Sequence, residues 1–151
     1  MNSRLTLAMG VLASLAIGCR VAPAHEGRQS QSAVMERKAE QALEELRQAY
    51  MARDLNGFFE RVSESSYFNG SDLRVKLSRQ FTDFSDLELS FWIDHALAEG
   101  KKVVVRMHWQ KRMTVNKTGR QATSSGRSDF IFEVRESAQL LDIQGSSPFA
   151  V

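Results

Sequence analysis

The sequence predicts an α+β fold in which three helices cover one face of a four-stranded antiparallel sheet. The apolar residues recur with a period of about 3.6 before Asp86 and with a period of 2 from there onward, as expected for helices followed by strands. The chain has 151 residues, of which 42% are hydrophobic and 25% charged, which is ordinary for one globular domain. A block of helices followed by a block of strands is typical of α+β domains.

The N-terminal residues predict an export signal. After Arg4, residues 5–18 carry no charge. This stretch is shorter than the roughly 18–20 apolar residues of a membrane-spanning helix, and it has the length of a secretory signal, about 7–15 residues. We therefore expect residues 1–18 to be a signal peptide, residues 19–32 a flexible polar tether and residues 33–151 the folded domain.

Cys19, the only cysteine, lies directly after this apolar stretch. The segment "LAIGC" resembles the lipobox of bacterial lipoproteins. The resemblance implies cleavage before Cys19, a diacylglycerol on its sulfur and a fatty acid such as palmitate on the new amine, so that the protein is anchored to a membrane of the cell envelope. Because Arg20 follows instead of aspartate, analogy with enteric lipoproteins implies the outer membrane, facing the periplasm. The alternative is cleavage after Ala24, which would remove Cys19 and give a soluble periplasmic or secreted protein.

Three amphipathic helices are expected before Asp86. Helical spacing of apolar residues predicts the first over residues 33–53. Asp54 is the expected N-cap of the second helix, and Ser71 is that of the third. The apolar faces consist of Ala39, Ala42, Leu43, Leu46 and Tyr50 in the first helix, Leu55, Phe58, Phe59 and Val62 in the second, and Leu73, Leu77, Phe81 and Phe84 in the third.

Four strands are expected from Asp86 onward, in the segments "DLELSFWIDH", "KVVVRMHWQKRM", "SDFIFEV" and "QLLDIQG". A three-residue loop at 99–101 would pair Asp94 with Arg106 and Glu88 with Arg112, and the next turn would pair Arg106 with Asp129. Opposite charges then face each other in both hairpins, which favours this register. The inward residues would be Leu87, Leu89, Phe91, Ile93, Val103, Val105, Met107, Trp109, Met113, Phe130, Phe132, Val134, Leu141 and Ile143.

Residues 34–149 resemble the nuclear transport factor 2-like superfamily, to which the SnoaL-like proteins with their cystatin-like cone belong. The resemblance is carried by "RDLNGFFERVSESSY" after the first helix, by "NKTGR" and "SGRSDFIF" in the strand region, and by "IQGSSPF" near the end. It implies that the sheet curves strongly and forms a cone with the helices, often with a pocket inside. The superfamily contains enzymes, binding proteins and accessory domains, so the fold does not assign a function.

Eight side chains are candidates for the lining of this pocket: Tyr50, Tyr67, Phe91, His95, Met107, Trp109, Lys111 and Ser128. We interpret His95, in phase with Ile93, as a residue at the rim of the sheet. Lys111 would extend its amine to solvent at the mouth of the cone, although it could instead neutralise an acidic ligand. Phe91, Met107 and Trp109 would form the core or line an apolar ligand site.

The sequence assigns no catalytic residue, cofactor or metal. Isomerases of the superfamily use inward carboxylates, whereas Ser128 occupies the inward position before Phe130, and residues 67–70 are too few for the hairpin that carries their base. His25, His95 and His108 lack metal-ligand spacing. Without residues 1–18 the formal charge is +1 and no long basic block remains, so nucleic acid is not an expected partner.

The outer face of the predicted sheet carries apolar side chains among charged ones: Trp92, Val104, His108 and Ile131, with Leu140 beside them. Such a surface is typical of a partner site or of a homodimer, and many relatives dimerise through this face. Three hypotheses follow. The leading one is a non-catalytic, lipid-anchored envelope domain that binds a partner protein or a small apolar ligand. The alternatives are an enzyme of the isomerase or dehydratase type with a divergent pocket, and a structural subunit that acts through the outer face.

Overall fold

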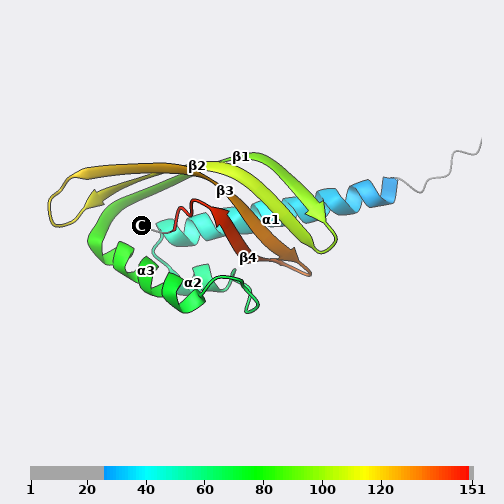
Figure 1. Ribbon diagram of the computed structural model, residues 1–151, viewed down its shortest axis with the longest axis horizontal. Coiled ribbons are helices and arrows are strands. Elements are labelled where there is room, and N and C mark those ends of the chain that lie inside the picture. Colours follow the sequence, from blue (N-terminus) through cyan, green and yellow to red (C-terminus); the bar gives the residue numbers. More distant parts are fainter. Residues whose placement is uncertain (1–25, 150–151) are drawn as a thin grey trace, which may run out of the picture.

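The computed structural model describes residues 26–149, with side chains from residue 31 onward. Within this range three helices precede four strands: α1 (Glu26–Met51), α2 (Leu55–Phe59), α3 (Gly70–Asp83), β1 (Phe84–Glu99), β2 (Lys102–Val115), β3 (Gln121–Val134) and β4 (Ala138–Gly145). The strands form one antiparallel sheet in the order β1-β2-β3-β4. The sheet arches over α1, with α2 and α3 below (Figure 1). The predicted α+β architecture is confirmed, whereas residues 1–18 and Cys19 lie outside the described range.

Helix α1 begins at Glu26, seven residues earlier than expected, so the backbone of residues 26–32 is helical and not a flexible tether. The physical reason is composition, because Glu, Arg and Gln are good helix formers and no proline follows Pro23 in this stretch. The predicted apolar face of the helix is confirmed. Its residues are all buried against the sheet and the other helices: Ala39, Ala42, Leu43, Leu46 and Tyr50.

The two shorter helices, α2 and α3, each begin at a side-chain N-cap. Asp54 caps α2 as predicted, since its Oδ1 accepts a hydrogen bond from Gly57 N at 2.9 Å. Helix α3 is capped by Asn69, not by Ser71: the Asn69 Oδ1 accepts from Ser71 N at 3.0 Å and from Asp72 N at 3.2 Å. Asparagine and serine cap about equally well, so the spacing of apolar residues could not separate them.

The β1–β2 hairpin has the predicted register in its far half and a different one near the turn. Glu88 pairs with Arg112 as expected. The turn contains two residues, not three, and His95 pairs with Arg106, so the predicted pairing of Asp94 with Arg106 is wrong. A β-bulge at Asp94 takes up the extra residue and restores the register beyond it. The one-residue error in the turn and the missed bulge cancel on the far side of the bulge, so the pairs there are as predicted. Between the bulge and the turn, the side chains of β1 point to the opposite face of the sheet from the one predicted.

The predicted pairing across the β2–β3 hairpin is confirmed, and the β3–β4 hairpin contains one further bulge. Arg106 pairs with Asp129 and Trp109 with Gly126. In β4, Phe132 pairs with Leu140 whereas Ile131 pairs with Asp142, which leaves Leu141 as the bulged residue. Leu140 therefore belongs to the inner core, and its expected place on the outer face is wrong.

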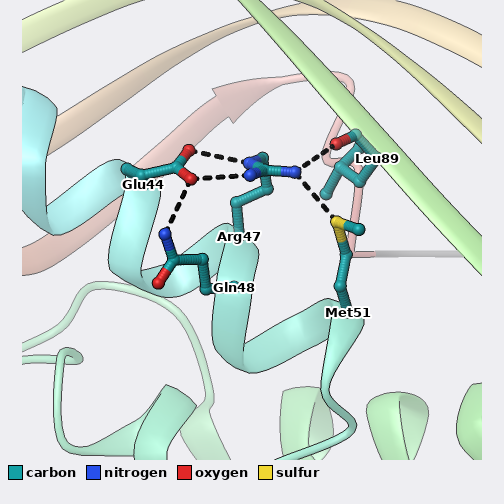
Figure 2. Close-up of polar contacts among 5 residues, drawn as sticks. All are labelled: Glu44, Arg47, Gln48, Met51 and Leu89. Carbon is teal, nitrogen blue, oxygen red and sulfur yellow. Dashed lines mark hydrogen bonds and ion pairs between the residues drawn. The ribbon is translucent and has the colours of Figure 1, made fainter.

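Helix α1 also contacts the free edge of the sheet, at β1. Arg47 donates to the Leu89 carbonyl at 3.1 Å, and Glu36 Oε1 accepts from Ala98 N at 3.3 Å. Figure 2 shows how Arg47 is held: Glu44 binds the guanidinium through both carboxylate oxygens, at 2.6 and 2.7 Å. The hydrogen bond from Arg47 lowers the pKa of Glu44.

The opposite edge, β4, is covered by the loop that follows α2. Val62 forms an isolated parallel bridge with Leu140, and backbone hydrogen bonds join Ser63 N to the Leu140 carbonyl (2.8 Å) and Tyr67 N to the Leu141 carbonyl (2.9 Å). The loop thus satisfies backbone groups that an edge strand would otherwise expose.

Candidate functional site: the interior of the cone and its C-terminal segment

Two residues that follow β4, Pro148 and Phe149, are buried in the interior of the cone. After Gly145 the chain turns back and runs under the sheet toward the helices (Figure 1). The side chain of Phe149 is fully buried (0% exposed). Its ring lies 4.8 Å from that of Phe58, 5.3 Å from that of Tyr50 and 5.9 Å from that of Phe130, measured between centroids. The Phe58 and Phe130 contacts are edge-to-face, an arrangement that aromatic pairs prefer.

Polar side chains of the interior bind the main-chain carbonyls of this segment. On the sheet side, the Trp109 indole Nε1 donates to the Ser146 carbonyl at 2.8 Å and to Ser128 Oγ at 3.0 Å. The Ser128 hydroxyl donates to the same carbonyl. One indole and one hydroxyl therefore converge on a single acceptor at the start of the segment.

Two further donors reach the end of the segment. Lys111 Nζ donates to the Pro148 carbonyl at 2.8 Å and lies 3.5 Å from Gln80 Oε1. Gln80 Nε2 donates to the Phe149 carbonyl at 2.6 Å, and the Gln80 amide is itself oriented by the Tyr50 hydroxyl, which donates to Oε1 at 2.9 Å. Donors from α3 and β2 thus hold the backbone on either side of the Phe149 ring.

Burial sets the electrostatics of this cluster. Lys111 is 1% exposed, and desolvation lowers the pKa of its amine to about 8. Desolvation also raises the pKa of the Tyr50 hydroxyl, so Tyr50 remains a neutral donor. Among the residues with described side chains, the buried polar ones are Ser63, Gln80, Lys111 and Ser128, and no carboxylate is among them. Three of these four bind segment 146–149.

Two glycines make room for the segment. Gly145 has φ +86°, and a Cβ there would lie 2.7 Å from the Arg127 carbonyl oxygen. A Cβ at Gly126 would lie 2.7 Å from both the Trp109 ring and Ser146 Cβ. A side chain at either position would therefore push the segment away from the sheet.

The structure brings together most of the predicted pocket residues. Tyr50, Met107, Trp109, Lys111 and Ser128 are buried in the interior, and Phe91 is half-buried beside them. The expectation that the Lys111 amine reaches solvent is wrong, because the segment after β4 supplies its acceptors inside the cone.

Two predicted pocket residues lie elsewhere. His95 is exposed on the outer face, because the bulge at Asp94 reverses the alternation of β1. Tyr67 is 66% exposed, and its hydroxyl accepts from Lys102 Nζ at 3.2 Å. Sequence reasoning missed Gln80 and Phe149. The only signal for Phe149 was a large apolar residue directly after a polar turn sequence, "GSSP".

An open pocket of about 230 Å³ lies beside Ser147 of the segment. Its lining combines apolar side chains of the α2–α3 loop, α3 and β4 with Ser147 of the segment itself, and includes Phe68, Leu73 and Ile143. The pocket reaches the segment from the solvent side, so the segment forms one wall of it.

The outer face of the sheet presents the predicted apolar residues. Trp92 is 46% exposed and stacks on the His108 ring at 5.2 Å between centroids, with an angle of 7° between the rings. Val104 pairs with Ile131 across β2 and β3. The bulge adds Leu97, which is 51% exposed and pairs with Val104.

Charged side chains surround this apolar row. Arg106 binds Asp129 with two hydrogen bonds, at 2.8 and 2.7 Å, which lower the pKa of the Asp129 carboxyl. His108 Nδ1 lies 3.2 Å from Asp94 Oδ1. The bulged residue Asp94 thus contacts His108 on the outer face, where Arg106 was the expected partner.

Neither a metal cluster nor a membrane-spanning helix is found in the part of the chain that the structure describes. No three His, Cys, Asp or Glu side chains among these residues lie close enough together to hold a metal ion. No helix in the same range combines the length and the apolar character that crossing a bilayer requires.

Solved structures share the fold at low sequence identity. A conserved protein of Planctomyces limnophilus matches with a TM-score of 0.67 and 12% identity, over 76% of this chain and 99% of that one. A nuclear transport factor 2-like superfamily protein of Salmonella enterica matches with a TM-score of 0.62 and 10% identity, over 77% and 92%. A ketosteroid isomerase-like protein of Erwinia carotovora matches with a TM-score of 0.62 and 13% identity, over 75% and 97%.

No protein-family model and no curated protein matches the sequence. At these identities the neighbours show the fold, which is the nuclear transport factor 2-like cone, and leave the activity open.

Proposed function

We propose that this protein is a non-catalytic binding domain, anchored by lipid on Cys19 to the bacterial cell envelope, that engages a partner protein through the outer face of its sheet. The observation that carries the proposal is the occupied cone. The interior side chains that could perform acid–base chemistry or bind a small apolar ligand are hydrogen-bonded to, or packed on, segment 146–149. While the segment is in place it occupies the position of a small apolar ligand, so a partner protein is the favoured one of the two expected partners.

The outer face supports the partner site. Its apolar side chains are flanked by charges of both signs, as in the rim of a protein interface. Trp92 is the natural anchor, since tryptophan is enriched among residues that dominate binding energies. A second copy of this chain is the partner that can be tested directly, and it would also satisfy the hypothesis of a structural subunit.

Light scattering at tens of micromolar tests this part of the proposal. We expect a mass twice that of the monomer, and a dissociation constant at least roughly tenfold weaker for Trp92→Ser, as for the loss of an interface anchor. Val75→Ser, which removes a half-exposed apolar residue from α3, is the matched control and should leave the dimer intact. A monomeric wild type, or equal weakening by both variants, would remove the homodimer from the proposal.

Fractionation tests the lipid anchor. Wild type should sediment with outer membranes and carry the added mass of its lipids on Cys19, whereas Cys19→Ser should be soluble. Ala22→Leu is the control, because it disrupts the alternative cleavage site and leaves the lipobox unchanged. A Cys19→Ser variant that fractionates like wild type would contradict the anchor.

An enzyme of the isomerase or dehydratase type is the second candidate. It is favoured by Lys111, since an amine with a pKa of about 8 suits proton transfer near neutral pH. Because Lys111 binds the Pro148 carbonyl, substrate could reach it only after segment 146–149 had left. Turnover of an enolisable ketone that is lost in Lys111→Met would favour this candidate, and its absence in a chain with the segment displaced would dismiss it.

A further inference from the structure

Segment 146–149 is held in the cone in the way that proteins hold a bound peptide. Only its first amide continues the sheet, since Ser146 N donates to the Arg127 carbonyl at 3.0 Å. From there on its carbonyls accept from side chains: Trp109 at Ser146, Lys111 at Pro148 and Gln80 at Phe149. Side-chain donors at fixed places in an apolar cavity are the usual composition of a ligand site.

The ring of Phe149 occupies the apolar part of this site. Tyr50, Phe58 and Phe130 surround it at 4.8–5.9 Å between centroids. The site therefore has two elements that a ligand must match, namely a socket for one aromatic ring and donors directed at carbonyl oxygens on either side of the ring.

Three polar side chains of the cone, Trp109, Lys111 and Gln80, satisfy the carbonyls of this one segment, where regular structure would use backbone groups. Burying a lysine is costly, and lysine is almost never fully buried in proteins without a partner. Lys111 and Gln80 are nevertheless buried against the segment. When the segment leaves, both lose a carbonyl acceptor, so the open cone would favour another ligand that returns such acceptors.

The segment also has a place from which it can swing out. Gly145, with φ +86°, is the turn between β4 and the segment. The pocket of about 230 Å³ beside Ser147 gives an incoming ligand a first contact at the mouth of the cone. Release of the segment after Gly145 would expose the site at the loss of one backbone hydrogen bond to the sheet, from Ser146 N to the Arg127 carbonyl.

We infer that the cone is a binding site for an aromatic ring flanked by carbonyl acceptors, and that segment 146–149 is its displaceable intramolecular ligand. The chemistry fits a peptide with a phenylalanine-like residue or a small aromatic amide. The inference goes beyond the proposed function and stands whether or not the lipid anchor and the dimer exist.

Peptide binding by the purified full chain tests the site. The probe is acetyl-Ser-Ser-Pro-Phe-amide, the sequence of residues 146–149, and the same peptide with Ala in place of Phe is its control. The resident segment competes at an effective concentration of the order of millimolar, so wild type should bind the probe weakly. Phe149→Ala, which empties the socket, should bind the probe at least roughly tenfold more tightly than wild type does. The same variant should bind the probe more tightly than it binds the alanine peptide.

A matched variant separates a specific site from general loosening. Leu141→Ala removes a buried side chain at the β4 bulge, outside the interior cluster, and should leave binding at the wild-type level. Equal gains in Leu141→Ala and Phe149→Ala, or no preference for the phenylalanine peptide in any variant, would overturn the inference. N-acetylphenylalanine amide distinguishes the two kinds of ligand. If it binds as tightly as the tetrapeptide, the site is one for small aromatic amides, and if it binds more weakly, the site is one for peptides.

Hydrogen exchange on wild type tests displacement without a destabilising substitution. The Trp109 indole N–H is shared between the Ser146 carbonyl and Ser128 Oγ, and it should become accessible to solvent when the segment swings out. We expect its protection factor to be at least roughly tenfold lower than that of the slowest amides of β2. Protection equal to those amides would mean that the segment leaves only on global unfolding, which would refute the inference.

Discussion

Wild type should gain stability as the pH rises above 8, and Lys111→Met should abolish this gain. Lys111 is buried with an amine pKa of about 8, whereas an unfolded chain has a lysine pKa near 10.4. Below pH 8 both states carry the proton, and burial disfavours the charged amine in the folded state. Between the two pKa values only the unfolded state binds the proton, so raising the pH stabilises the folded state.

The magnitude follows from the two pKa values. The slope approaches about 1.4 kcal/mol per pH unit between them, which gives a gain of about 2 kcal/mol from pH 7.5 to pH 9.5. Above pH 10 the unfolded state begins to ionise Tyr50, whose pKa is raised in the folded state, and this opposes any further gain. The window below pH 10 therefore isolates Lys111.

Urea denaturation at several pH values measures the effect. Wild type should gain stability across the window at unchanged m-value, and Lys111→Met should lack that slope. Lys102→Met is the control, because Lys102 is an exposed lysine on the same strand and should keep the wild-type slope. Parallel curves for wild type and Lys111→Met would show that the amine is not buried in its charged form, and the argument from burial would fail.

Two further substitutions test local features. Gly126→Ala should lower the free energy of unfolding by about 1–3 kcal/mol, since the new methyl group overpacks against Trp109 and Ser146. It should also shift the NMR resonance of the Trp109 indole, and an unchanged resonance would show that the segment does not lie against Trp109. Asp54→Ala should cost about 1 kcal/mol in urea denaturation by removing the acceptor for Gly57 N, whereas Asp54→Asn should retain most of the stability, and equal losses would assign the effect to charge instead of capping.

Secondary structure and strand register could be predicted from the sequence where a single physical signal determined them. The change of period at Asp86 separated helices from strands to within two residues, since β1 begins at Phe84, which was expected in the third helix. The opposite charges of Arg106 and Asp129 fixed the second hairpin. The first hairpin shows the limit. The pairing of Glu88 with Arg112 was correct. Beyond the bulge at Asp94, Glu99 pairs with Lys102 and again matches opposite charges, while Ala96, Leu97 and Ala98 are all apolar and do not alternate, so neither signal could reveal the bulge.

The candidate site was predictable only in part. The alternation of β2 correctly placed Met107, Trp109 and Lys111 on the inner face. What fills the interior depends on a segment without periodicity, and a single Phe149 after a turn carries no pattern that distinguishes a core residue from an exposed one. For the same reason the inner face alone could not show that the Lys111 amine has an acceptor inside the cone.

Both edges of the sheet are contacted by other parts of the chain, which limits how copies of this protein can assemble. Side chains from α1 bind backbone groups of β1 at Leu89 and Ala98, and the loop after α2 occupies the backbone of β4 at Leu140 and Leu141. A neighbouring molecule would have to displace these contacts before it could extend the sheet by another strand. The association through the outer face that we propose would leave both edges as they are and, with two-fold symmetry, would close after two copies. The fold therefore favours finite assemblies over open-ended strand stacking.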